Sequence, residues 1–110
     1  MIQACLRMDF AKEKIDGAML TLSSLVERIR AEAGCIDCSV YLDTEFENRV
    51  VLLQKWRTES DLNRHLRSEE YKMVLLIIET AISPPMIMFD TISSTSGVEI
   101  IEEARKVKKD

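Results

Sequence analysis

Hydrophobic and polar residues alternate along the first ten positions of the chain. Ile2, Ala4, Leu6, Met8 and Phe10 share one face of an extended segment, and the residues between them share the other. A period of two over this length predicts a strand with one buried face.

The next segment has the spacing of an amphipathic helix. Its apolar residues recur three, four and seven positions apart, which places them on a single helical stripe. They are Ile15, Ala18, Met19, Leu22, Leu25, Val26, Ile29 and Ala33. We expect Gly34 to lie just past the helix end, where glycine adopts a left-handed backbone conformation at low cost.

Two strands are predicted after this glycine. In the first, the side chains expected to point inward are Ile36, Cys38, Val40 and Leu42. A polar turn over 44–48 follows, with Asn48 as a suitable turn residue. The second strand, 50–56, is apolar on both faces and therefore needs cover on both. Its two faces carry Val50, Leu52 and Trp56 on one side, and Val51 and Leu53 on the other.

Two helical pieces and a last strand complete the pattern. A capping box at 58–61 begins a short helix with Leu62 and Leu66 on its apolar side. A second piece runs from about Ser68 to Ile82, and two prolines directly beyond stop it. The segment 86–93 predicts a fourth strand, again apolar on both faces.

The element order β-α-β-β-α-β predicts a ferredoxin-like α+β fold with a four-stranded antiparallel sheet and the helices on one face. We place this domain at residues 1–95. Residues 96–110 form a charged tail with at most a short helix, in which Glu102 and Lys106 make an i,i+4 pair. The uncovered sheet face would expose apolar surface on the order of several hundred Å², so we expect a sheet-to-sheet homodimer.

Composition narrows the class of protein. The 110 residues include 15 Lys and Arg against 19 Asp and Glu, and a net charge of −4 argues against nucleic-acid or anionic-membrane partners. The longest apolar run, Val74–Ile78, is far shorter than the roughly 20 residues of a membrane span. With no stretch typical of a signal peptide, we expect a cytoplasmic location and reduced cysteines.

Four short motifs occur in a specific order. They are Glu32-Ala-Gly-Cys35, Val40-Tyr-Leu-Asp43, Val51-Leu-Leu-Gln-Lys-Trp56, and His65-Leu-Arg-Ser68 followed by Tyr71. Together they resemble the antibiotic biosynthesis monooxygenase (ABM) family, over residues 1 to about 93. The family pattern has Pro where this chain has Ala33, and Lys55 beside the tryptophan is a second departure. The resemblance implies a dimeric α+β barrel, in agreement with the dimer expected from strand composition.

The resemblance implies several chemistries. Family members that form quinones with O₂ and no cofactor pair the strand tryptophan with an Asn and a Tyr, which here correspond to Leu52 and Leu62 beside a retained Trp56. Heme-degrading members use an Asn, a Trp and a His ligand, and these positions hold Leu6, His65 and Leu75. The heme constellation is therefore absent and the quinone-forming one mostly absent.

His65, the single histidine, is the candidate catalytic base, because an imidazole with an ordinary pKa of about 6.5 suits proton abstraction near neutrality. The alternative is a partly exposed His that complements the helix dipole. Trp56 is a candidate wall for an aromatic ligand or a core aromatic. Tyr71 is a core residue whose hydroxyl could meet a substrate oxygen. Arg7 could hold an anion, or lie in solvent or a dimer interface.

The Cys35-x-x-Cys38 spacing resembles a redox or metal motif, but its context disfavours both. The pair enters a strand and does not open a helix, and strand residues three apart point to opposite faces. No second cysteine pair completes a zinc site, so we expect neither metal nor cofactor.

Three functions remain. The first is a cofactor-independent monooxygenase acting on a small aromatic or enolic compound. The second is a non-catalytic dimeric ligand-binding or structural module, motivated by Leu52 and Leu62 at positions expected to be polar. The third is heme handling.

Overall fold

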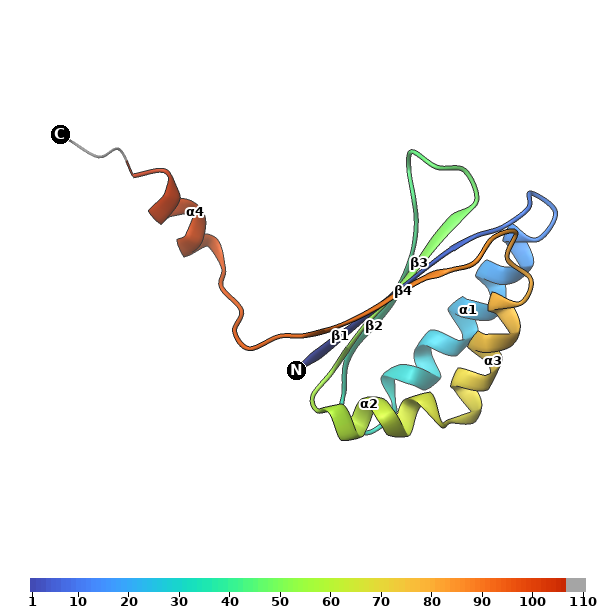
Figure 1. Cartoon of the computed structure of the whole chain (residues 1–110), viewed down its shortest axis with the longest axis horizontal. Coiled ribbons are helices and arrows are strands. Elements are labelled where there is room, and N and C mark those ends of the chain that lie inside the picture. Colours follow the sequence, from blue (N-terminus) through green and yellow to red (C-terminus); the bar gives the residue numbers. More distant parts are fainter. Residues whose placement is uncertain (107–110) are drawn as a thin grey trace.

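The computed structural model describes residues 1–106. The elements are β1 (Ile2–Asp9), α1 (Ile15–Arg30), β2 (Cys35–Leu42), β3 (Arg49–Trp56), α2 (Glu59–Leu66), α3 (Glu69–Ile78), β4 (Met86–Thr91) and α4 (Val98–Ala104). The four strands pair antiparallel in the order β2-β3-β1-β4. Helices α1, α2 and α3 lie on one side of this sheet (Figure 1). The predicted ferredoxin-like α+β fold is confirmed.

The pairing register assigns each strand residue to a face. Leu6 lies opposite Leu52 on one side and Ile87 on the other, so these three share the face under the helices, which we call the covered face. The five alternating residues predicted for the first strand all lie there and are buried. They pack with the most deeply buried apolar residues of α1, which are Leu22, Leu25 and Ile29.

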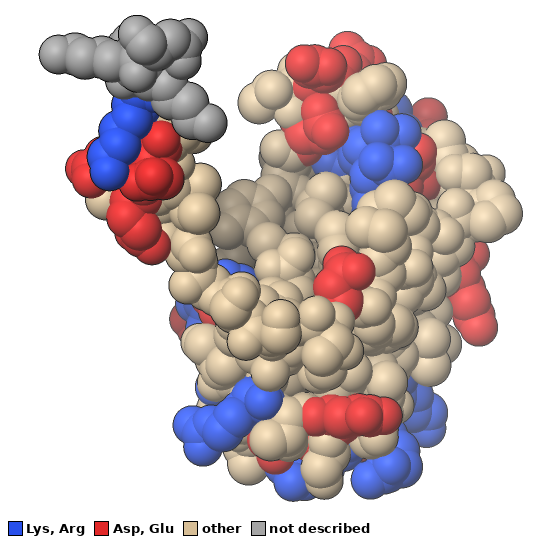
Figure 2. Space-filling view, turned by 60° about the vertical axis from the view of Figure 1, so that its left-hand side comes forward, with Lys and Arg blue, Asp and Glu red and all other residues tan. Residues whose placement is uncertain are grey.

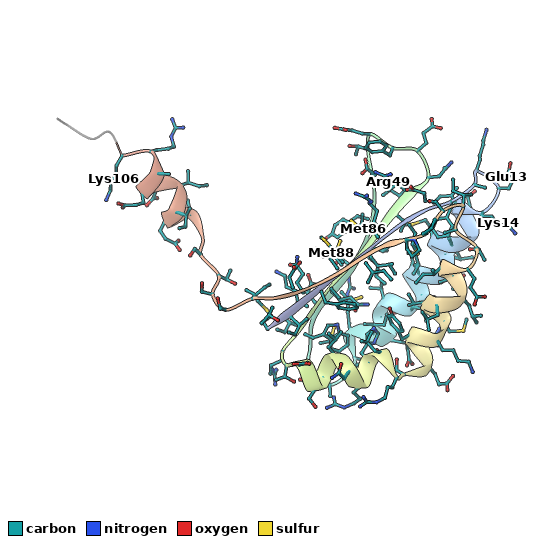
Figure 3. All side chains as sticks on the ribbon, in the orientation of Figure 1. Glu13, Lys14, Arg49, Met86, Met88 and Lys106 are labelled. Carbon is teal, nitrogen blue, oxygen red and sulfur yellow. The ribbon has the colours of Figure 1, made fainter. Side chains whose placement is uncertain are left out.

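We call the opposite side of the sheet the open face, and within residues 1–106 no helix packs against it (Figures 1 and 3). By register it carries Gln3, Cys5, Arg7, Asp9, Val51, Leu53, Lys55, Met86, Met88 and Asp90. Val51 and Leu53 are partly exposed, and Met88 is 46% exposed. The prediction that 50–56 is apolar on both faces is therefore confirmed.

Strand β2 departs from strict alternation. Its pairing with β3 shifts between Cys35 and Asp37, which leaves Ile36 as the extra residue of a bulge. Ile36 is 51% exposed, and Leu42, the last residue of this edge strand, is 55% exposed. The prediction of inward side chains was right for Cys38, Val40 and Leu42, which lie opposite Gln54, Leu52 and Val50 of the covered face, and wrong for Ile36.

The bulge also corrects the expected placement of the cysteine pair. Cys35 lies opposite Trp56 and Cys38 lies opposite Gln54. Since Gln54 and Trp56 are two apart on one strand, both cysteines lie on the covered face. The expectation that they point to opposite faces was wrong because the inserted residue restores their alignment.

The helix boundaries follow local hydrogen bonding. Helix α1 ends at Arg30, so Ala33 lies outside it, and Gly34 adopts the predicted left-handed conformation (φ +83°) four residues later. The hydroxyl of Thr58 accepts from the Asp61 N–H, which confirms the predicted cap. Helix α3 ends at Ile78, earlier than the expected Ile82.

One ion pair near the end of the described chain differs from the predicted one. Lys106 Nζ lies 2.9 Å from Glu103 Oε2, so the predicted partner Glu102 was wrong. The spacing of three places both side chains on the same side of the last turn. Among residues 1–106, no helix combines the length and the apolar character needed to cross a membrane.

Candidate functional site

Three aromatic rings meet on the covered face, beside the junction of α2 and α3. The His65 ring stacks on Trp56, with centroids 4.5 Å apart and planes 24° apart. Tyr71 meets the same imidazole edge-on at 5.3 Å. Trp56 ends β3, His65 lies in the last turn of α2, and Tyr71 lies in the first turn of α3. The structure thus brings together three of the candidate residues named in the sequence analysis.

A short break between α2 and α3 makes this meeting possible. The hydroxyl of Ser68 accepts a hydrogen bond from the Tyr71 N–H and so caps the start of α3. Serine is a favoured residue at this position because its side chain satisfies an otherwise unpaired helix N–H. Two separate helices therefore turn His65 and Tyr71 toward each other.

His65 is fully buried and has a carboxylate partner. Its Nδ1 lies 3.0 and 3.1 Å from the two oxygens of Glu32, in the loop between α1 and β2. Because a carboxylate only accepts, Nδ1–H donates to Glu32, and in the neutral form of the ring the lone pair lies on Nε2. The alternative of a partly exposed helix-end histidine was wrong.

The other ring nitrogen of His65 has no such partner. Its Nε2 is buried, and no donor or acceptor among the described residues lies within hydrogen-bond distance. A buried polar atom without a partner costs free energy, so such atoms are uncommon outside functional sites. The Glu32–His65 pair therefore holds an oriented imidazole with one free basic nitrogen.

Gln54 is a buried polar residue that the sequence analysis missed. Its side-chain oxygen accepts a hydrogen bond of 3.1 Å from the Trp56 indole N–H, and the residue is 4% exposed. The signal was present, since Gln54 interrupts the apolar residues on the inward face of β3. It fixes the plane of Trp56 and, through stacking, supports the imidazole.

The thiols of the Cys35-x-x-Cys38 pair are protonated near neutral pH. Burial raises the pKa of Cys38 to about 12. Burial, and then the nearby charge of Glu32, also raise the pKa of Cys35. Neither thiol is a thiolate nucleophile. Residues 1–106 contain no cluster of three or more His, Cys, Asp or Glu side chains able to hold a metal.

A small apolar cavity lies beside this cluster. Its volume is about 20 Å³, room for about one water molecule, and its lining residues are Ala4, Cys5, Leu6, Leu52, Gln54, Tyr71, Ile87 and Phe89. Burial raises the pKa of Tyr71, so its hydroxyl stays protonated and can donate a hydrogen bond.

A larger groove adjoins the cavity. Its volume is about 280 Å³, and it is lined by Ile2, Glu59, Leu62, Asn63, Leu66, Phe89 and Thr91. Phe89 lines both spaces and is 47% exposed at the sheet edge. The two leucines that stand at expected polar positions line these spaces, Leu52 the cavity and Leu62 the groove.

Arg7 is the predicted site residue that the structure does not bring to this cluster. It lies opposite Val51 and Met86 and therefore projects from the open face, on the other side of the sheet. Its expected alternative setting, in solvent or in a dimer interface, agrees with this position.

Comparisons with known proteins agree with this architecture. The structure is similar to that of an antibiotic biosynthesis monooxygenase (20% identity, TM-score 0.77, covering 86% of this chain and 100% of that one). It is also similar to a conserved protein from Methanosarcina mazei Go1 (29% identity, TM-score 0.75, 81% and 89%) and a protein from Mycobacterium tuberculosis (18% identity, TM-score 0.79, 87% and 98%). No curated protein sequence matches this chain.

A comparison of the sequence with a family model identifies the protein family. The model of the antibiotic biosynthesis monooxygenase family matches residues 1–74, which contain β1 to β3 and the whole aromatic cluster. The match covers most of the chain and agrees with the motif order noted above. The chain therefore belongs to the antibiotic biosynthesis monooxygenase family.

Proposed function

We propose that this chain is a cofactor-independent monooxygenase that oxidises a small aromatic or enolic compound with O₂. In this reaction a phenol becomes a quinone: one oxygen atom enters the ring and the other leaves as water with the two hydrogens lost from the substrate. The substrate supplies the electrons, so the protein needs to supply a base, a binding site and shelter from solvent.

The observation that carries the proposal is the oriented, buried His65. Its Nε2 has a free lone pair, and the Glu32 carboxylate stabilises the imidazolium that forms when Nε2 takes a proton. Removing a phenolic or enolic proton leaves an electron-rich anion, which is the species that reacts with O₂. Tyr71 can donate its hydroxyl proton in a hydrogen bond to the substrate oxygen.

The groove next to the cavity is the proposed binding site for the substrate ring. Leu62 and Leu66, which lie before and after His65 along α2, give the groove apolar walls. Asn63 and Thr91 provide polar groups at its edge. A flat molecule with one or two oxygens matches this mixture of apolar walls and a few polar contacts.

Oxygen uptake tests the proposal. Purified protein is screened with quinols, flavonoids and small enols, and the best substrate is then given to His65→Gln. We expect turnover to fall about 10²- to 10⁴-fold, the range that a positioned base contributes. Unchanged turnover in a folded His65→Gln protein would exclude His65 as the base.

Glu32→Gln is the companion variant. Its amide can still lie beside Nδ1 but no longer stabilises the imidazolium, so we expect a smaller loss than for His65→Gln and a change in the pH–rate profile. A fall in activity with an unchanged profile would point to a structural role for Glu32.

A binding module without catalysis is the second candidate. Its support is the small volume of the cavity and the presence of Leu52 in the cavity wall and Leu62 in the groove wall, where quinone-forming relatives are expected to be polar. Saturable binding of an aromatic compound that consumes no O₂ would favour this candidate over the first.

The proposed partner is a second copy of the chain, seated on the open face. That face combines partly exposed Val51, Leu53 and Met88 with the charges of Arg7 and Asp9. A face of this kind is typical of a surface that another subunit covers. Sedimentation equilibrium at micromolar concentration should return twice the chain mass.

A further inference from the structure

The chain beyond β4 leaves the body of the domain. The Ile92 N–H donates to the Met1 carbonyl at 2.8 Å and so anchors the start of this segment beside β1. Residues Ser93–Gly97 then lead to α4, which stands clear of the sheet and of the other helices (Figure 1). The radius of gyration is 17.0 Å, against about 13 Å for a compact chain of this length.

Helix α4 exposes large apolar side chains to solvent. Val98 is 65% exposed, Ile100 and Ile101 are each 58% exposed, and no residue of the helix is buried. At about 100° per residue, Val98, Ile100, Ile101 and Ala104 fall within about 160° of the helix circumference and form one broad apolar side, with the three glutamates on the other. A helix of seven residues is too short to be stable in water by itself, so this apolar side needs a surface to pack on.

Two of the acidic side chains of α4, Glu99 and Glu103, make contacts within this segment. The Gly97 N–H donates to Glu99 at 2.7 Å, and Lys106 pairs with Glu103 at 2.9 Å. These local contacts stabilise the two ends of the helix. The apolar side chains of the helix stay exposed to solvent.

The position of α4 indicates which surface that is. It lies on the side of the sheet opposite α1–α3, and Figure 2 shows the hollow between α4 and the body of the molecule. A second copy seated on the open face would enter this hollow. The linker Ser93–Gly97 spans up to about 17 Å when extended, and packed sheets lie about 10 Å apart, so the helix reaches past the plane between them.

We propose that α4 is an exchanged arm, and that in the homodimer each copy packs the Val98–Ile101 side of its α4 against the other copy. The inference rests on the proposed dimer through the open face. Two-fold symmetry makes the contact occur twice, so both arms stabilise one interface. The arm thus adds a helix contact to the contact between the two sheets.

Site-specific photocrosslinking tests this contact. A photoreactive phenylalanine analogue at Ile100 should give a crosslinked product of twice the chain mass on a denaturing gel. The same group at Leu20, which is 75% exposed on α1, should give none and serves as the control. A crosslink found only within one chain, or a crosslink to other proteins only, would overturn the proposal.

A triple variant, Val98→Ser with Ile100→Ser and Ile101→Ser, gives an independent measure. We expect its dimer dissociation constant to rise at least about tenfold, since three aliphatic side chains lose their contacts, whereas Leu20→Ser leaves it unchanged. A wild-type dimer with unchanged affinity in the triple variant would overturn the arm and leave the dimer intact. A monomeric wild type would overturn both.

Discussion

The two faces of the sheet are built from the same strands but differ in kind. On the covered face, β1 and β3 contribute alternate residues that are buried or nearly so, including Gln54 and Trp56. On the open face, the residues between them are partly exposed, and Asp9 forms an ion pair with Arg49 at 2.7 Å. The covered face is a buried core that encloses a polar cluster, whereas the open face is partly exposed and mixes apolar with charged side chains.

Replacing Trp56 by Ala should have the largest effect on folding. The indole is fully buried, stacks on His65 and donates to Gln54, so we expect the free energy of unfolding to fall by about 3–5 kcal/mol. Urea denaturation measures the loss. Leu53→Ala, on the same strand and the open face, should cost the monomer far less; equal losses would remove the distinction between the faces.

A charge on the open face should act on assembly and leave folding almost unchanged. Leu53→Glu would place an unpaired carboxylate in the proposed interface, and we expect the dimer dissociation constant to rise at least about 30-fold, or about 2 kcal/mol. Analytical ultracentrifugation gives the constant, and circular dichroism checks the fold. A dimer of unchanged affinity would show that the open face is not the interface.

The sequence predicted the covered face well because alternation and helical spacing are local patterns. The inward residues of β1, with Phe10 directly after it, and the cap at Thr58 need only nearby residues to be recognised. The errors arise where the position of a side chain is determined by distant residues or by an irregular strand pairing. The bulge at Ile36 changes the register of β2, and the carboxylate partner of the buried His65 is Glu32, which is 33 residues away along the chain.

Alanine replacements at Gly34 and Gly17 should change the stability of the fold in opposite directions. Gly34 has φ +83°, and a Cβ there would collide with the Asp61 side chain, so Gly34→Ala should cost about 1–2 kcal/mol. Gly17 lies in α1 with open space around it, and Gly17→Ala should stabilise by about 0.5–1 kcal/mol. Thermal melts of the two variants should move in opposite directions, and a shift in the same direction would contradict this account.

The smallest effect belongs to the ion pair on the open face. The hydrogen bond from Arg49 lowers the pKa of Asp9 in the folded state, so its stabilisation is present above the unfolded pKa and is lost as pH falls through the folded one. Asp9→Asn should therefore cost about 0.5–1 kcal/mol at pH 7 and nothing in strong acid.

Urea midpoints of wild type and Asp9→Asn, measured from pH 7 downward, give this difference. The control is Asp90→Asn, which changes another aspartate on the same face. A gap between wild type and Asp9→Asn that stays constant with pH would mean that the carboxylate is not responsible.

The break between α2 and α3 determines whether the imidazole and the phenol can touch at all. In one continuous helix, six residues of separation would rotate Tyr71 about 240° away from His65, so the rings would point to different sides of the rod. The interruption at Ser68 removes that rotation. A replacement that lets the helix run through this point would dismantle the aromatic trio without altering a single ring.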